Sequence, residues 1–236
     1  NEDYHRVWQF PVGNGDLTLL AVADGMGGAA AGEVASKLAM EVLDEGFSRY
    51  VDEIRANKPV VGIDKLIDKA VRLANRRVYA ASIKQQGRRG MGTTITCVAI
   101  YQRKAYIGHV GDSRAYLARG NKIYQLTKDH SWVEEQLEKG LLNEREAESH
   151  EWRNLITRVL GTRPQVAPDV IEIAVEKNDV FVISSDGLHG LVKPEEMLAE
   201  LKRTTNRQLS VEVLIALANE RGGPDNITLI IAEVDE

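Results

Sequence analysis

Four aspartates stand where apolar strands meet short loops, a position from which carboxylates can bind metal ions. They are Asp24 after 17–23, Asp112 after 107–111, Asp186 after 180–185 and Asp225 before 227–231. A single Asp-Gly pair is most often a simple turn. A carboxylate near a core, however, is costly unless it is paired or metal-bound. If these strands share one sheet edge, the four carboxylates converge there.

Converging carboxylates repel one another, and a divalent cation that prefers oxygen ligands, Mg²⁺ or Mn²⁺, relieves that repulsion. The glycine-rich loop 24–28 allows a close backbone approach and an exposed carbonyl beside such a metal. This loop lacks the Lys-Ser/Thr of a phosphate-binding P-loop and the spacing of a dinucleotide fingerprint. Zinc is disfavoured because the histidines show no paired ligand spacing; they are His5, His109, His130, His150 and His189.

Length and composition limit the class of protein that can carry these residues. The chain has 236 residues, 43% hydrophobic and 28% charged, with net charge −5 and pI near 5.7. We predict one domain over 1–236. We also predict no nucleic-acid partner, since there is no excess of Lys and Arg to neutralise phosphates. Cys97 lies in an apolar run and is predicted to be a core residue. With no apolar run long enough to span a membrane and no signal peptide, we predict a cytoplasmic protein without a membrane segment.

Periodicity predicts the elements that hold the aspartates in place. Helical apolar stripes run over 32–50 and 67–81, with Gly87 as the stop of the second. Strands are predicted at 17–23, 93–101, 104–110, 114–118, 123–126, 169–175, 180–184 and 227–234, and further helices at 195–202 and 209–219. Hairpin-like succession of strands and paired helices favour packed sheets with helices outside over alternating βαβ units.

Eight segments, in order and spread over essentially the whole chain, resemble the PPM family of metal-dependent protein phosphatases of PP2C type, specifically its bacterial members. They are Asn1-Glu-Asp3, 22–28, 90–94, 108–114, 126–131, 156–161, 184–188 and 225–228. The resemblance implies an α+β fold: a four-layer α-β-β-α sandwich of two mainly antiparallel sheets flanked by helices. It also implies a binuclear metal centre at one end of the sandwich.

The resemblance implies a role for each matching residue at the first metal. Asp24 would bridge two Mn²⁺ or Mg²⁺ ions, and the Gly25 carbonyl would bind one of them. Glu2 would serve the metal on the Gly25 side, directly or through water, and Asp3 would support these ligands.

The same resemblance assigns the remaining ligands. Asp186 and Asp225 would hold the other metal, and Asp112 with Asp186 would hold a third, weaker ion. Asp24, Asp186 and Asp225 would act in catalysis through the metal-bound water. The segment 131–158 would be a flap beside the active site that helps to select substrates.

The arginine that binds phosphate in the family stands three residues before the Asn of the Asn-Glu-Asp motif. That position precedes Asn1, so we expect the chain to be N-terminally truncated, and its substrate-binding residue stays unassigned. Arg88 and Arg89 could steer a phosphate, although paired exposed arginines are usually just solvated. Arg114 is expected to support the fold rather than to contact substrate.

Two further departures concern the centre itself. Met26 stands where many eukaryotic members carry a histidine proposed as general acid, although Met is common in bacterial members. Gly190 stands where the family usually has an acidic residue near the third metal, so we expect a weak third site. His189 is either a loop residue or a ligand.

The resemblance implies a protein phosphatase that hydrolyses phosphoserine and phosphothreonine on proteins through a metal-activated water. Its partners would be phosphorylated proteins and a counterpart Ser/Thr kinase. One alternative is a two-metal phosphodiesterase or nuclease built on the same carboxylates, which the acidic pI disfavours. Another is a non-catalytic pseudophosphatase that binds phosphoproteins, which should have lost metal ligands.

Overall fold

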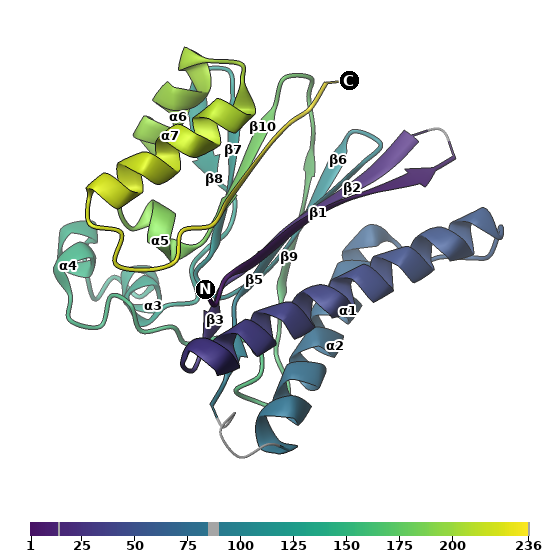
Figure 1. Ribbon diagram of the computed structural model, residues 1–236, viewed down its shortest axis with the longest axis horizontal. Helices are drawn as coiled ribbons and strands as arrows, with labels where there is room; N and C mark the ends of the chain where they lie inside the picture. Colours follow the sequence, from purple (N-terminus) through teal and green to yellow (C-terminus); the bar gives the residue numbers. More distant parts are fainter. Residues whose placement is uncertain (14, 85–89, 236) are drawn as a thin grey trace.

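The fold has four layers in the order helices, sheet, sheet, helices (Figure 1). The computed structural model describes residues 1–13, 15–84 and 90–235. Gly87, predicted as a helix stop, and Arg88 and Arg89, candidates to steer a phosphate, lie outside these residues. Apolar clusters fill the space between the layers: one under the first helix pair, one between the sheets and one under the C-terminal helices. The predicted α-β-β-α architecture is confirmed.

The larger sheet is antiparallel and has the strand order β1-β2-β5-β6-β9. Its strands are β1 (Tyr4–Val12), β2 (Gly15–Ala23), β5 (Ile95–Tyr101), β6 (Lys104–Val110) and β9 (Asp169–Ala174). The two longest helices, α1 (Ala29–Arg55) and α2 (Ile63–Lys84), cover its outer face. The predicted helical stripe of α1 is buried against this sheet, with Leu43 and Phe47 fully inaccessible.

The smaller sheet has the order β11-β10-β7-β8 and is also antiparallel. Its strands are β7 (Arg114–Arg119), β8 (Lys122–Gln125), β10 (Val180–Ser184) and β11 (Leu229–Glu233). Helices α5 (Asp186–His189), α6 (Pro194–Arg203) and α7 (Arg207–Glu220) pack on its outer face. Phe181 and Ile183 lie between the sheets, whereas Val182 lies under the helices. Because β10 is buried on both faces, its sequence is a continuous apolar run.

Short elements complete the chain near one end of the sandwich. They are the two-stranded pair β3 (Gly25–Met26) and β4 (Gly92–Thr93), and the helices α3 (Trp132–Glu138) and α4 (Glu144–Ser149). Ser131 caps α3, and a capping box formed by Asn143 and Glu146 begins α4. Among the helices of the described residues, none is both long enough and apolar enough to cross a bilayer.

Two elements differ from the sequence prediction. β1 was not predicted, because as an edge strand it is largely exposed and carries Pro11, so it shows no clear apolar alternation. The strand predicted at 93–101 is divided at Thr94 into β4 and β5. Thr94 leaves the ladder because its backbone N–H donates to the carbonyl of Asp24.

Candidate metal centre

Strand direction brings the predicted aspartates to the ends of both sheets. β2 and β6 each pair antiparallel with β5, so they run in the same direction and finish at the same end of the larger sheet, followed by Asp24 and Asp112. In the smaller sheet, the end of β10 pairs with the start of β11, next to Asp186 and Asp225. The carboxylates therefore come from two facing sheets, at one end of the sandwich as the resemblance implies, and not from the single sheet edge that the sequence pattern alone suggested as a condition.

The register of β1 brings Asp3 beside Asp24. These two residues flank the paired ends of β1 and β2. The Ser185 hydroxyl donates to Asp3 Oδ2 over 2.8 Å and accepts a hydrogen bond from the Thr228 N–H over 3.0 Å. The N-terminal residues from the larger sheet are thereby tied to the loops of the smaller sheet.

Glu2 lies beside Gly25, as the sequence predicts. Its N–H donates to Asn226 Oδ1 and its carbonyl accepts from Ser36 Oγ, both over 2.7 Å. Its carboxylate lies so close to Gly32 that a Cβ there would overlap it, and a Cβ on Gly25 would meet the carbonyls of both Gly32 and Glu2. Glycine is therefore needed at both positions for this close backbone approach.

Hydrogen bonds to two threonines fix the backbone of Asp24. Its carbonyl accepts from the Thr94 N–H over 2.8 Å and from Thr93 Oγ1 over 2.9 Å. Its own N–H donates to Thr94 Oγ1 over 2.9 Å, and the same hydroxyl lies 2.8 Å from Ser113 Oγ. Thr94 thus connects the loop that carries Asp24 to the loop that carries Asp112.

The carboxylates interact electrostatically. Burial, followed by the charge of four neighbouring carboxylates, raises the pKa of Asp24 to about 9. Those neighbours are, in order of effect, Asp3, Asp186, Asp112 and Asp225. Burial and the charge of Asp186 raise the pKa of Asp112 to about 7. Burial also raises the pKa values of Asp3 and Asp186, with a further contribution from Asp225. Like charges are thus held together out of water, which a cation would offset.

Two buried oxygens fit a cation directly. Oδ1 of Asp112 and Oδ1 of Asp186 are inaccessible to solvent and have no hydrogen-bond partner. Buried carboxylate oxygens without a donor are rare, and a metal is one of the few partners that satisfies them. No three His, Cys, Asp or Glu side chains of the described part of the chain already stand in a ready-made ligand cluster. The donor set, all oxygen, suits Mg²⁺ or Mn²⁺ rather than zinc.

The structure also shows the contacts and burial of three further residues from the sequence analysis: Arg114, Cys97 and His189. Arg114 forms a bidentate ion pair with Asp129, with its nearest contact Nη2 to Oδ2 at 2.7 Å, and thus supports the fold as predicted. Cys97 is fully buried, which raises the pKa of its thiol to about 12 and makes it a poor nucleophile. His189 Nδ1 lies 3.1 Å from Ser184 Oγ, so the ring, on α5, has a hydrogen-bond partner at the end of β10.

Sequence reasoning did not find the polar residues that hold the centre together. Four of them each bind a loop that is distant in sequence, with partners up to 224 positions apart: Thr94, Ser113, Ser185 and Asn226. All four lie within the segments that carry the resemblance, which was their one available signal.

Together, the four-layer sandwich and its acidic end define a metal-dependent hydrolase of the two-metal type. Residues 1–219 match the sequence profile of the family described as Protein phosphatase 2C. The chain therefore belongs to the protein phosphatase 2C family.

Known relatives are bacterial. The chain is 33% identical over 235 residues to the serine/threonine phosphatase stp of Listeria monocytogenes, covering 100% of this chain and 90% of the relative. It is 33% identical over 236 residues to protein phosphatase PhpP of Streptococcus pneumoniae, covering 100% and 92%.

Solved structures agree with this placement. The serine/threonine phosphatase of S. agalactiae has a TM-score of 0.86 at 33% identity, covering 100% of this chain and 93% of that one. The catalytic domain of the phosphatase PstP, solved in complex with two manganese ions, has a TM-score of 0.80 at 33% identity, covering 99% and 98%.

Proposed function

We propose that this chain hydrolyses phosphoserine and phosphothreonine on proteins, at a centre that holds two Mn²⁺ or Mg²⁺ ions. The observation that carries the proposal is the acidic end of the sandwich. There, burial and the charge of four carboxylates raise the pKa of Asp24, and two buried carboxylate oxygens have no hydrogen-bond partner. The relatives at about one-third identity are named as serine/threonine phosphatases.

Each ligand has a proposed place. Asp24 would serve both ions, and the Gly25 carbonyl and Glu2 would serve one of them. Asp186 and Asp225 would hold the other. Two observations support this division: Glu2 lies close to Gly25, and the charge of Asp225 adds to burial in raising the pKa of Asp186.

When bound, the two ions activate a water molecule and offset the charge that develops on the phosphoryl oxygens. The chain's own residues keep the geometry fixed. Asp3 is bound by Ser185. Thr94 holds the backbone of Asp24 through two hydrogen bonds, and Thr93 adds a third. Buried Cys97 has no part in the reaction.

Phosphate release from a phosphothreonine peptide tests the proposal. We expect activity with Mn²⁺, none with EDTA, and full recovery when Mn²⁺ is added back. Asp186→Ala should stay inactive at every Mn²⁺ concentration. Binding of the phosphopeptide without phosphate release would favour the pseudophosphatase. Cleavage of bis-p-nitrophenyl phosphate in preference to p-nitrophenyl phosphate would favour the phosphodiesterase.

Gly187 gives a test that changes no charge. A Cβ at this position would overlap the backbone carbonyl of Asn226 and push away the loop that carries Asp225. We expect Gly187→Ala to reduce kcat/KM about 100-fold, because a displacement of about 1 Å at a reactive centre has that effect. Gly46→Ala, whose Cβ would make only an ordinary contact at 3.7 Å, is the matched control and should stay fully active. Equal activity of the two variants would contradict the assignment of Asp225.

Asp112 and Asp186 are proposed to hold a third ion weakly, since Gly190 supplies no carboxylate beside them. Calorimetric titration with Mn²⁺ should give two tight sites and a third at least about tenfold weaker, since affinity falls with the number of charged ligands. Three equally tight ions in the native chain would refute the weak site.

The remaining assignments are also proposals. Residues 1–236 form one catalytic domain, and 131–158 form its flap. The natural partners are phosphorylated proteins and the Ser/Thr kinase that modifies them, with no nucleic acid involved. The cytoplasmic location stays a prediction.

A further inference from the structure

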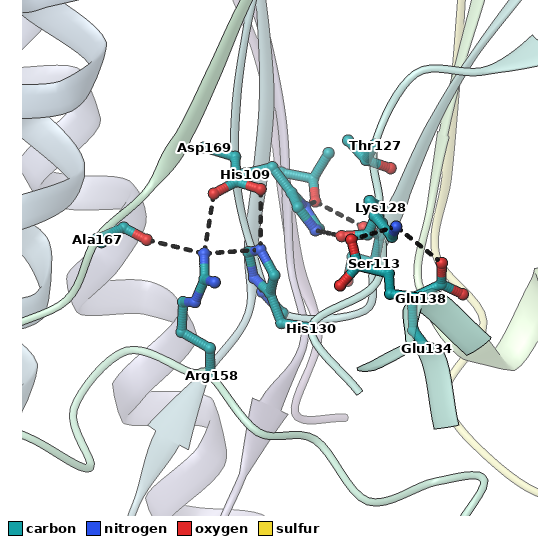
Figure 2. Close-up of polar contacts among 12 residues, drawn as sticks. His109, Ser113, Thr127, Lys128, His130, Glu134, Glu138, Arg158, Ala167 and Asp169 are labelled. Carbon is teal, nitrogen blue, oxygen red and sulfur yellow. Dashed lines mark hydrogen bonds and ion pairs between the residues drawn. The ribbon is translucent and has the colours of Figure 1, made fainter. Parts of the chain in front are cut away.

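His130 links the acidic centre to the segment 131–158. It precedes α3 and lies against the loop between β6 and β7, which carries Asp112 (Figure 2). The His130 N–H donates to the Gly111 carbonyl over 2.7 Å, and the Gly111 N–H donates to His130 Nδ1 over 3.0 Å. Both backbone groups of Gly111, the residue before Asp112, are therefore bound by one histidine.

These contacts determine the tautomer of His130. Nδ1 accepts from Gly111, so a neutral ring must carry its proton on Nε2, and Nε2–H then donates to Asp169 Oδ2 over 3.1 Å. Arg158 Nη1 also lies 2.8 Å from Nε2. The two hydrogens of Arg158 Nη1 are already donated to Asp169 Oδ1 at 2.9 Å and to Ala167 O at 3.1 Å. The Nδ1–H tautomer would leave the Gly111 N–H facing another donor.

The outer side of His130 is bound to the end of the flap segment. The His130 carbonyl accepts from the Thr157 N–H over 2.7 Å. Figure 2 shows that Asp169 lies between the His130 ring and Arg158 and contacts both. The His109 ring packs against the His130 ring at a tilt of 34°, with centroids 4.7 Å apart. Burial lowers the pKa of His130, and it lowers that of His109 to about 3, so both rings are neutral.

We propose that His130 is a positioning residue for the metal centre: by binding both backbone groups of Gly111 it sets the place of Asp112. This inference rests on the proposed assignment of Asp112 as a metal ligand. Residues that hold a ligand in place typically change metal affinity by about 10- to 100-fold when they are replaced. Nδ1 of His130 carries this role, whereas Nε2 attaches the ring to Asp169.

Two amide variants separate the two ring edges. In His130→Asn the side-chain oxygen takes the place of Nδ1 and can still accept from Gly111. In His130→Gln the amide reaches toward Asp169 but leaves the Gly111 N–H without an acceptor. We expect calorimetry to show Mn²⁺ affinity at the weakest site reduced about tenfold in His130→Gln and by less than about twofold in His130→Asn. Equal losses in the two variants would overturn the proposal.

A double-mutant cycle tests whether His130 acts through Asp112. Asp112→Asn alone should remove the weakest Mn²⁺ site. Adding His130→Gln should then cause no further loss of Mn²⁺ affinity at the remaining sites. A full additional loss, or no effect of Asp112→Asn on Mn²⁺ binding, would overturn the proposal. Neither result bears on the phosphatase reaction, which the EDTA and Asp186→Ala assays judge separately.

Nuclear magnetic resonance keeps the test open if His130→Gln does not fold. In the native chain, titration with Mg²⁺ should shift the Gly111 amide resonance and the ¹⁵N resonance of His130 Nδ1. Both shifts should be largely absent in Asp112→Asn. Resonances that stay unmoved at saturating Mg²⁺ in the native chain would overturn the proposal.

Discussion

Asp24→Asn is expected to reduce Mn²⁺-dependent phosphate release by at least about a thousandfold and to make the metal-free protein more stable. The loss follows from its proposed place between the two metal ions. The gain follows because burial and four neighbouring carboxylates disfavour the charge of Asp24, raising its pKa to about 9. An amide of the same shape removes that charge. Near pH 8 we expect a gain of about 2 kcal/mol, a rise in melting temperature of roughly 4–8 °C.

The matched control is the same change at the other end of the adjacent sheet. Asp179 immediately precedes β10, is buried, and is bound by Arg119 through two contacts of 2.6 and 2.8 Å. Asp179→Asn should lower stability by about 3 kcal/mol, because it leaves part of a buried ion pair uncompensated. Its kcat/KM should stay within about twofold of the native value, as it lies away from the metal centre. The two substitutions thus have opposite effects on stability, and only Asp24→Asn reduces activity.

Phosphate release at varied Mn²⁺ and calorimetric unfolding in EDTA measure both effects. An Asp24→Asn protein that is inactive and less stable than the native chain would show that Asp24 is structural, not a metal ligand. One that keeps activity would exclude Asp24 from the reaction.

The buried parts of the fold were predictable because burial leaves a direct mark on the sequence. β10 is buried on both faces and reads as a continuous apolar run, and α1 places Leu43 and Phe47 on one stripe. The aspartates at the ends of such runs stood out for the same reason. β1 carries no such mark, because most of its side chains face solvent.

The division of the site between two sheets was not predictable in this way. Apolar alternation shows that a strand is buried, but not which strands become its neighbours. β2 and β5 are adjacent in the sheet although two long helices separate them in the chain. Contacts such as Gly111 with His130 or Glu2 with Asn226 depend on that topology. Only the resemblance to a known family could supply these residues before the structure did.

The stability of the metal-free protein is expected to fall as pH rises from about 7 to about 8.5, the opposite of ordinary carboxylate behaviour. The pKa of Asp24 is about 9 in the fold against an ordinary value of 3.8. Between these values the folded chain holds a proton that the unfolded chain has released, so stability decreases with pH. The limit for one proton is about 1.4 kcal/mol per pH unit. We expect a total loss of about 2 kcal/mol over this window.

The buried histidines, Asp112 and Cys97 have their effects mostly outside this pH window. Burial lowers the pKa values of His109, His130 and His189, which makes stability rise with pH, but only below their ordinary value of 6.5. The raised pKa of Asp112, about 7, has its effect mostly below the window. Cys97 acts only above its ordinary value of 9.0. The raised pKa values of Asp3 and Asp186 change stability in the same direction as that of Asp24. The slope between about pH 7 and 8.5 therefore reports on the acidic cluster, and comparison with Asp24→Asn isolates the part that comes from Asp24.

Calorimetric unfolding in EDTA at both pH values measures this loss as a drop in melting temperature of roughly 4–8 °C. Asp24→Asn should show little of the drop, because it has no proton to release. Saturating Mg²⁺ should also remove it, since a bound cation stabilises the ionised carboxylates and makes the bound proton unnecessary. A native chain whose metal-free stability is constant or rises over this window would show that Asp24 is ionised at neutral pH without a metal. The electrostatic argument for the centre would then fail, even if the phosphatase activity itself were present.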